Sequence, residues 1–246
     1  MCTLTWLTND HGYEVFFNRD EQRNRAPAIP PLLDNESDSI MPIDPQGKGT
    51  WIAVNSSGIT LCLLNNYQAA KKMIKTDQTS RGLLIPSLIK NKSYSEILRH
   101  LHDINLGNYM PFMLCIFPEN LNNDNKKIHF YQWDGNRLTK EQNDQPITSS
   151  AVSLKEVEKS RTNLFMASVG DQSDSEKHLI YHASHKPEKG KYSVCMHRQD
   201  AHTQSLSHIT VGHDIEFRYH GESPCQHTQW SQVIISCNNA ISNCNN

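Results

Sequence analysis

The sequence predicts an α+β fold built in layers, with sheets that are largely antiparallel. The first part of the chain contains two β-hairpin patterns in succession. Segments with helical periodicity then come in groups between pairs of strand-like segments, instead of alternating with single strands. No repeat or linker-like stretch interrupts the chain. Hairpin-connected strands with grouped helices are typical of the α+β class.

The first hairpin determines where the N-terminal residues lie. Residues 2–8 and 13–18 are rich in β-forming residues and flank a loop of turn formers at residues 9–12. In an antiparallel pair with its turn centred in that loop, the numbers of paired residues add up to about 21. Cys2 is therefore expected to lie opposite Arg19.

The remaining elements follow in order along the chain. The proline-rich residues 22–48 are expected to form a surface loop, and residues 50–54 and 59–64 a second hairpin whose apolar second strand is buried on both faces. Helices are predicted at residues 81–91, 93–103, 153–165 and 174–184, two of them opened by capping boxes at Ser93–Glu96 and Ser153–Glu156. Further strands are predicted at residues 112–117, 128–133, 192–198, 203–211 and 215–220. Residues 1–236 are expected to form one domain, and the Asn-rich residues 237–246 to fray.

Composition and charge exclude several classes of function. The 246 residues are 37% hydrophobic and 20% charged, with a formal net charge of −2, so no basic surface for nucleic acid is indicated. No apolar run approaches the ~20 residues of a membrane span, and the start of the chain lacks the basic region of a signal peptide. The seven cysteines are scattered, which favours free thiols and a reducing, cytoplasmic location. A small molecule is the expected partner.

Cys2 is the candidate nucleophile. It follows the initiator methionine directly, and a small second residue is the usual condition for removal of that methionine. The processed chain would begin with a residue that carries both a thiol and a free α-amine. Because this amine has a pKa of about 7.7–8.0, it can accept the thiol proton near neutral pH. The alternative is a small apolar residue that merely opens a strand.

The run Asn18-Arg19-Asp20-Glu21 forms the second part of the candidate site. A guanidinium opposite Cys2 would favour the thiolate and could orient an anionic group of a substrate. A carboxylate from Asp20 or Glu21 could hold the α-amine in place. The alternative for this run is a solvated strand end.

A carboxamide forms the third part of the candidate site. Asn65 and Asn66 end the apolar strand 59–64. A side-chain amide in this position can donate to the negative charge that develops on a carbonyl oxygen under attack. The alternative is a pair of residues that starts a loop.

Further motifs are spread along the chain, and together with the start they resemble the NRDE family, whose eukaryotic branch is called transport and Golgi organisation protein 2. The motifs are Met1-Cys2-Thr3, Asn18–Glu21, Gly49–Ala53, Asn66-Tyr67, Ser80–Gly82, Thr148–Ser150 and Cys195–Ala201. The family is similar in turn to the Ntn hydrolases, above all to bile-salt hydrolases and penicillin V acylases. This resemblance, which spans residues 1–224, implies a four-layer αββα sandwich.

The resemblance also implies roles for particular residues. Either Arg161 or Arg198 corresponds to the last arginine of the acylase site, and Ser149-Ser150 stand where the acylases carry a later asparagine. The candidate catalytic residues are Cys2, Arg19, Asp20, Asn66 and Arg198. The candidate substrate-binding residues are Asn18, Glu21, Trp51, Ser150 and Arg161, although Trp51 also fits an ordinary core position.

Two functions are expected from these residues. The first is hydrolysis of the amide or thioester bond of a small acyl compound, for which no cofactor is required. The alternative, implied by roles proposed for the family, is a carrier that binds haem in haem trafficking, or an acyl-CoA or other lipid, in the same pocket.

Histidines and a methionine near the C-terminus are the candidate axial ligands for such a haem, although ordinary structural roles are favoured. They are Met196, His197, His202, His208 and His213. The spacing of His178, His182 and His185 would suit a metal. A solvated helix face is favoured for these three, and no metal site is predicted.

Overall fold

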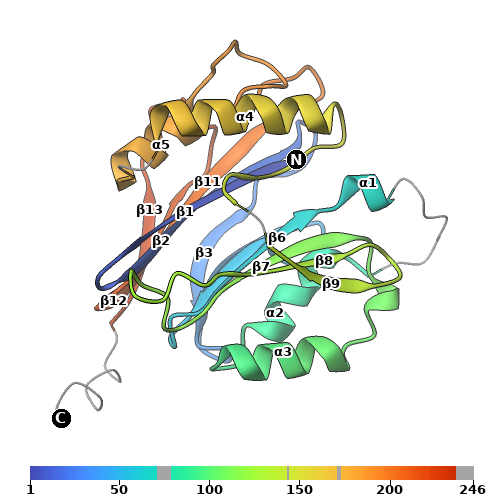
Figure 1. The fold of residues 1–246 in the computed structure, drawn as a ribbon, viewed down its shortest axis with the longest axis vertical. Helices are drawn as coiled ribbons and strands as arrows, with labels where there is room; N and C mark the ends of the chain where they lie inside the picture. Colours follow the sequence, from blue (N-terminus) through green and yellow to red (C-terminus); the bar gives the residue numbers. More distant parts are fainter. Residues whose placement is uncertain (71–78, 143, 171–172, 237–246) are drawn as a thin grey trace.

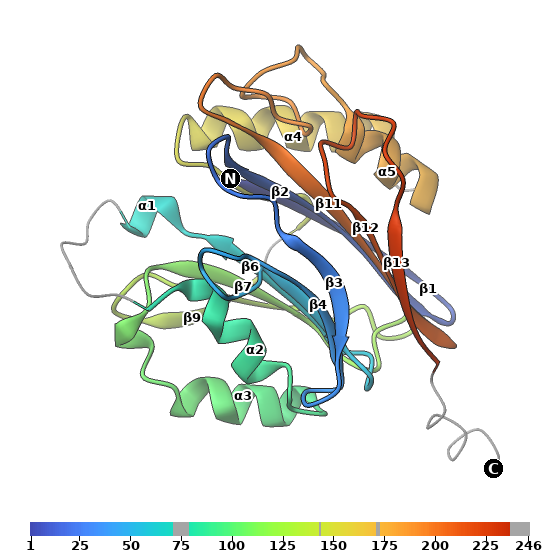
Figure 2. The same ribbon diagram turned by 180° about the vertical axis from the view of Figure 1, so that it is seen from behind.

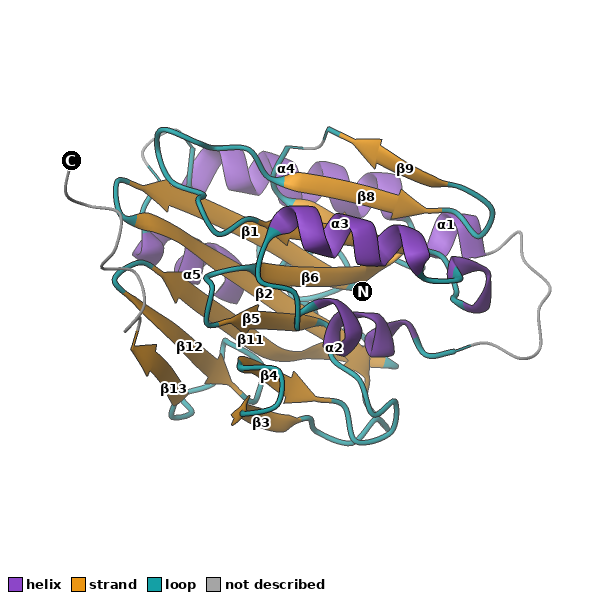
Figure 3. Cartoon of the chain, turned by 90° about the horizontal axis from the view of Figure 1, so that it is seen from below, coloured by secondary structure: helices purple, strands orange, loops and turns teal. Residues whose placement is uncertain are grey.

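The computed structural model describes residues 1–70, 79–142, 144–170 and 173–236, so the predicted fraying of residues 237–246 lies outside the described residues. Two antiparallel sheets pack face to face (Figure 1). Helices α4 (Leu154–Ser168) and α5 (Ser175–Ala183) cover the outer face of one sheet, and α2 (Leu84–Leu88) and α3 (Tyr94–Asp103) cover the other. Figure 3 looks along the stack of layers, with α2 and α3 in front of the sheets and α4 and α5 behind them. This arrangement confirms the predicted α+β class and the four-layer αββα sandwich.

The first sheet contains the N-terminal strand near one edge. Its strands, in spatial order, are β10 (Ile147–Ser149), β1 (Cys2–Asn9), β2 (Gly12–Gln22), β11 (Ala201–Val211), β12 (Asp214–His220) and β13 (Ser231–Ser236). The pairing of β1 with β2 has the predicted register, since Cys2 lies opposite Arg19. On its other side Cys2 lies opposite Ser149 of β10. Local hairpin geometry therefore brings the predicted thiol and guanidinium together.

The second sheet is formed by the middle of the chain. Its strands are β3 (Ile29–Asp34), β4 (Ser39–Ile43), β5 (Ile52–Asn55), β6 (Thr60–Asn65), β7 (Phe112–Phe117), β8 (His129–Trp133) and β9 (Leu138–Glu141). The second predicted hairpin is confirmed as β5 and β6, and β6 is buried except at Asn65. β3 lies beside β13, so the edges of the two sheets approach one another on that side (Figure 2).

The prediction of a surface loop at residues 22–48 is wrong, because this stretch contributes β3 and β4. Pro30 and Pro31 lie where the pairing of β3 with β4 shifts register, between Ile29 and Leu32. β3 is the edge strand of its sheet. An edge strand tolerates proline because the missing N–H groups can face away from the neighbouring strand.

The predicted strand at residues 192–198 is also wrong. The backbone N–H of Cys195 donates to the carbonyl of Ser184, and that of His197 donates to the carbonyl of Gly190. These groups are thus satisfied by a compact loop rather than by a sheet ladder. The residues of this loop lie against the first sheet, since Asn18 of β2 donates to the carbonyl of Val194.

The helices begin as predicted, although one predicted cap is wrong. The Ser93 hydroxyl accepts from the backbone N–H of Glu96 at the start of α3, which confirms that N-cap. Ser153 has a φ of 47° and makes no side-chain cap hydrogen bond at the start of α4. α1 (Tyr67–Ala70) and the short 3-10 helices Arg81–Leu83 and Leu106–Asn108 complete the helical elements of the described residues. Among those residues, no helix is both long and apolar enough to cross a bilayer.

Candidate active site

A pocket of about 280 Å³ lies beside Cys2 and is lined from both sheets. The first sheet contributes Cys2 of β1 and Arg19 of β2, whereas the second contributes Asn65 at the end of β6. Trp51 adds an aromatic wall from the segment just before β5. The structure therefore places the predicted nucleophile in a cavity with a guanidinium and a carboxamide.

Successive side chains of a strand point to opposite faces, and this alternation divides the run Asn18-Arg19-Asp20-Glu21. Arg19 and Glu21 line the pocket beside Cys2. The carboxylate of Asp20 instead meets Arg161 of α4, with Oδ2 and Nη2 3.5 Å apart. Of the two candidate acids, Glu21 thus shares the pocket with Arg19, and Asp20 faces the helical layer.

The Arg19 side chain is held in place on several sides. Its guanidinium donates to Oε1 of Gln204 and lies 3.4 Å from carboxylate oxygens of both Glu21 and Asp44. Its Cζ lies 4.4 Å from the centre of the Trp51 ring, which is a cation–π contact. The side chain is only 6% exposed. Arg19 is therefore a fixed positive charge at the pocket wall.

Sequence reasoning assigned no role to Arg25, Asp44 or Arg81, which also line the pocket. Arg25 donates to Asp44 and Arg81 donates to the carbonyl of Pro111. Burial alone would raise the pKa of Asp44, but the hydrogen bond from Arg25 and the charge of Arg19 outweigh it and lower the pKa. Burial lowers the pKa of Arg81.

These residues could have been found only in part. Arg81 belongs to the motif Ser80–Gly82, which indicates no particular role, whereas Arg25 and Asp44 lie within residues 22–48, where the sequence predicts a surface loop. Three guanidinium groups now face two carboxylates around the pocket, because Glu21 and Asp44 are the acids in its lining. The wall carries a net positive charge, which favours an anionic group on a ligand.

Met1 is buried where the chain begins, directly before Cys2. The Met1 amine donates to the Asp20 carbonyl at 3.2 Å and to the Tyr67 hydroxyl at 3.3 Å. Burial alone would lower the pKa of this amine, but the Cys2, Tyr67 and Asp20 groups beside it raise it overall. Burial raises the pKa of the Cys2 thiol. In the chain that retains Met1, therefore, the neutral thiol is favoured.

The Met1 side chain lies between two predicted site residues. Its Sδ accepts from the Ser150 hydroxyl at 2.9 Å and lies 3.7 Å from Nη1 of Arg198. Arg198 also donates to Asp200 at 2.6 Å. Ser150 and Arg198 thus lie at the N-terminus of the chain, and Met1 fills the space between them.

The predicted residues Asn18 and Arg161 do not line the pocket beside Cys2. Asn18 donates through Nδ2 to the carbonyls of His182 and Val194, which ties β2 to the helical layer. Arg161 is fully buried and donates to the hydroxyl of Thr3 as well as pairing with Asp20. Both side chains lie on the face of the first sheet that α4 and α5 cover.

Two carboxamides stand at the end of β6. Asn65 lines the pocket beside Cys2 and donates to the Tyr67 hydroxyl at 2.8 Å. Asn66 accepts through Oδ1 from the backbone N–H of Ala69 and lines an adjacent pocket with Ser150. Asn65 thus reaches the Tyr67 hydroxyl, which also accepts from the Met1 amine, whereas Asn66 faces the adjacent pocket.

The prediction of a solvated face for the histidines of α5 is wrong. His178 and His182 are fully buried, and both rings contact the hydroxyl of Thr5 on β1, at 2.7 and 2.8 Å. The His178 ring stacks on Phe16 with centroids 4.7 Å apart. These histidines attach α5 to the sheet. Among the described residues that line the Cys2 pocket there is no histidine.

The fold of the chain is that of the Ntn hydrolases. It is similar to the C2A mutant of conjugated bile acid hydrolase from Clostridium perfringens, with a TM-score of 0.52, 12% identity, and coverage of 95% of this chain and 92% of that chain. It is also similar to the Caenorhabditis elegans ortholog of N-acylethanolamine-hydrolyzing acid amidase, with a TM-score of 0.50, 8% identity, and coverage of 85% and 92%.

Within this fold, the sequence identifies a narrower group. Residues 1–233 match the family model described as transport and Golgi organisation 2, and the chain belongs to that family. The match covers both sheets and both helical layers, and it confirms the resemblance drawn from the motifs. Comparison with curated proteins yields no match.

Proposed function

We propose that the protein hydrolyses a small amide or thioester, with Cys2 as the nucleophile after removal of Met1. The observation that carries this proposal is the single pocket shared by Cys2, Arg19 and Asn65. The likeness in fold to proteins named as a bile acid hydrolase and an acid amidase supports a hydrolase-like scaffold. The size and charge of the acyl compound are inferred from the pocket rather than from these neighbours.

Removal of Met1 would activate the site in several ways. It frees an α-amine on Cys2 and reduces the burial that raises the pKa of the thiol. It also releases the backbone N–H of Asp20, which donates to the Met1 carbonyl at 2.9 Å. The space between Ser150 and Arg198 is vacated at the same time. A carbonyl group of the substrate could then enter beside the sulfur.

The reaction would proceed through an acyl-enzyme. The Cys2 sulfur bonds to the carbonyl carbon while the thiol proton passes to the Cys2 amine. As the tetrahedral intermediate collapses, the bond to the leaving nitrogen or sulfur breaks and that atom takes the proton. Water then attacks the acyl thioester, giving its proton to the amine and restoring the thiol. Atoms and charges balance without a cofactor.

The oxyanion donor is assigned to Asn66 from the sequence, and the geometry offers Asn65 as a second candidate. Asn66 is oriented by its bond from Ala69, and Asn65 lines the same pocket as the nucleophile. Loss of the true donor costs on the order of 10²–10³ in kcat. Turnover by Asn65→Ala and by Asn66→Ala therefore distinguishes the two.

The pocket indicates the size and charge of the ligand. Sites for drug-sized ligands have volumes of roughly 300–1,000 Å³, and this pocket, at about 280 Å³, lies at the lower limit. The net positive wall favours a carboxylate or phosphate near the scissile bond. An N-acyl amino acid or a short acyl thioester with an anionic group meets both requirements.

The experiment is to follow acylation of the intact protein. Mass spectrometry of the purified chain should show loss of Met1, and incubation with an N-acyl amino acid or an acyl-CoA should add one acyl mass. The Cys2→Ala variant should show no adduct. Cys115→Ala is the matched control because Cys115 is fully buried in β7, away from the pocket, and it should acylate normally. Retention of Met1, or equal labelling of Cys2→Ala, would reject the proposal.

Carriage without turnover is the second candidate, and one observation favours it. While Met1 remains, burial keeps the Cys2 thiol neutral by raising its pKa, yet Arg19, Arg25 and Arg81 still face the pocket. In this form the protein would bind the anionic part of an acyl-CoA or the propionates of haem. Titration of Cys2→Ala with each ligand separates this function from hydrolysis, because binding by a carrier does not require the thiol.

A further inference from the structure

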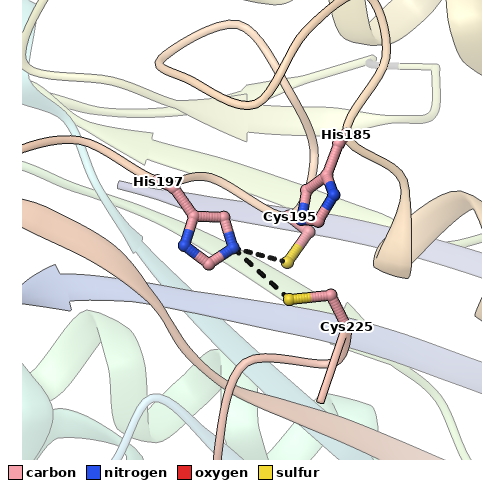
Figure 4. Close-up of side chains that lie close together, drawn as sticks. All are labelled: His185, Cys195, His197 and Cys225. Carbon is pink, nitrogen blue, oxygen red and sulfur yellow. Dashed lines mark hydrogen bonds between the residues drawn. The ribbon is translucent and has the colours of Figure 1, made fainter.

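Four side chains with metal-binding atoms meet at the outer side of the first sheet, away from the Cys2 pocket. They are His185, Cys195, His197 and Cys225, and their ligand atoms all lie within 4.8 Å of one another. Figure 4 shows the four side chains turned toward a common centre, with His197 bonded to both cysteines. Nε2 of His197 lies 3.4 Å from each sulfur.

We propose that these four residues bind one Zn²⁺ ion in a closed, structural Cys₂His₂ site. Zinc–sulfur bonds of about 2.3 Å and zinc–nitrogen bonds of about 2.0 Å place tetrahedral ligands about 3.3–3.8 Å apart. The two sulfur–nitrogen distances to His197 already fall in that range. The remaining ligand atoms need to draw in by about 1 Å, a shift that side-chain rotation supplies.

An unsatisfied atom points independently to a ligand at this place. Nε2 of His185 is buried and has no hydrogen-bond partner within the described part of the chain. A buried polar nitrogen without a partner is costly, and it is expected to bind something that the protein itself does not supply. The ring of His185 lies edge-on to that of His197, with centroids 5.1 Å apart. A metal between them would satisfy this nitrogen.

The chemistry of the ligand set favours zinc over hard cations. Two thiolates and two neutral imidazoles suit Zn²⁺, whereas Mg²⁺ and Ca²⁺ require oxygen ligands. The two thiol protons pass to the solvent on binding, so the completed site carries no net charge. A neutral complex avoids the cost of burying a charge. All four positions are filled by protein, which leaves no open position for a substrate.

The ligands come from two loops that the ion would join, the one between α5 and β11 and the one between β12 and β13. His185 follows α5, Cys195 and His197 lie in the loop that replaced a predicted strand, and Cys225 lies between β12 and β13. Arg198, next to His197, reaches the N-terminus of the chain. The zinc would therefore hold the loop that positions Arg198, and it would explain why residues 192–198 are compact without belonging to a sheet.

The test uses the full chain. Elemental analysis of protein purified under reducing conditions should find one zinc per chain. Replacement by Co²⁺ should give the absorption of a tetrahedral site with thiolate-to-cobalt charge transfer. His185→Ala and Cys225→Ser should weaken zinc binding by more than the 10–100-fold that loss of an outer-shell partner costs. His185→Cys should retain zinc, because it replaces one ligand with another.

The control is His213→Ala, whose side chain is 92% exposed and which should keep one zinc per chain. Far-UV circular dichroism of each variant checks that loss of zinc is not loss of folding. A chain that binds no zinc with its cysteines reduced would overturn the proposal. So would zinc binding that persists unchanged in His185→Ala and Cys225→Ser, or a Cys195–Cys225 disulfide found in the protein as purified from the cell.

Discussion

At the scale of single residues, the candidate site is governed by the alternation of side chains along β2. The register that joins Cys2 to Arg19 followed from the turn alone, and the period of a strand could also have separated Arg19 and Glu21 from Asn18 and Asp20. Predicting which face of β2 lines the pocket requires knowing where the second sheet packs. That sheet is brought into place by contacts far apart in the sequence, which no local pattern contains.

A close approach of two glycines shapes the pocket wall. The backbone N–H of Thr50 donates to the carbonyl of Gly82 at 3.0 Å. A Cβ atom added at Gly49 would lie 2.3 Å from the carbonyl carbon of Gly82, so a side chain there would push the two segments apart. These segments carry Trp51 and Arg81, which line the pocket.

We therefore expect Gly49→Ala to lower the free energy of unfolding by about 1–3 kcal/mol, the usual cost of overpacking. Binding of an anionic ligand should weaken as well. Gly190→Ala is the matched control, since a Cβ there meets no atom within 4 Å, and its stability should change by less than about 0.5 kcal/mol. Urea unfolding of both variants measures the difference, and equal effects would contradict the argument.

At the scale of elements, the long and strongly patterned segments were predicted well and the short ones were not. The hairpins of β1–β2 and β5–β6 and the helices α3 and α5 lie where sequence patterns placed them. Strands such as β9, β10 and β13 were missed because three to six residues show little periodicity. β3 was missed because its prolines signal a loop, although an edge position tolerates them.

The docking of α4 on the first sheet depends on a buried ion pair. Arg161 of α4 and Asp20 of β2 are both 0% exposed at their side chains. The Asp20 carboxylate also accepts from the Thr203 hydroxyl at 2.6 Å, and Arg161 donates to Thr3. Removal of either partner would leave a charge buried without its counterion.

We expect Arg161→Met to lower the free energy of unfolding by about 3–5 kcal/mol, because it strands the Asp20 carboxylate in the interior. The matched control is Lys92→Met. Lys92 pairs with Asp38 at the surface, where the two side chains are 47% and 54% exposed, so this substitution should lower the free energy of unfolding by less than about 1 kcal/mol. Chemical denaturation of both variants gives the comparison. A loss for Arg161→Met no larger than that for Lys92→Met would show that the buried pair does not stabilise the docking of α4.

At the scale of the whole molecule, the layered architecture was predictable from the order of the elements, whereas the way the helical layer attaches was not. His178 and His182 occupy positions on α5 that suggest a solvated face, yet both are buried against Thr5 and Phe16. Their sequence segment is polar, so periodicity of apolar residues could not reveal the buried side. Polar residues that pair with one another inside a protein leave little trace in such patterns.

This attachment predicts how the stability of the molecule depends on pH. Burial lowers the pKa of His178 to about 4 and that of His182 well below its ordinary value. In the unfolded chain both histidines titrate near pH 6.5. Below that pH the unfolded state therefore binds more protons than the folded state. Stability should therefore fall as the pH decreases from about 6.5 toward 4, by about 1.4 kcal/mol per pH unit for each such histidine.

Urea unfolding at pH 7.5, 6 and 5 measures this slope. His178→Gln should reduce the slope, whatever effect the substitution has on stability at pH 7.5. The exposed His213→Ala should leave the slope unchanged, and a slope equally steep in His178→Gln would mean that protonation acts elsewhere than at the junction of α5 with the sheet.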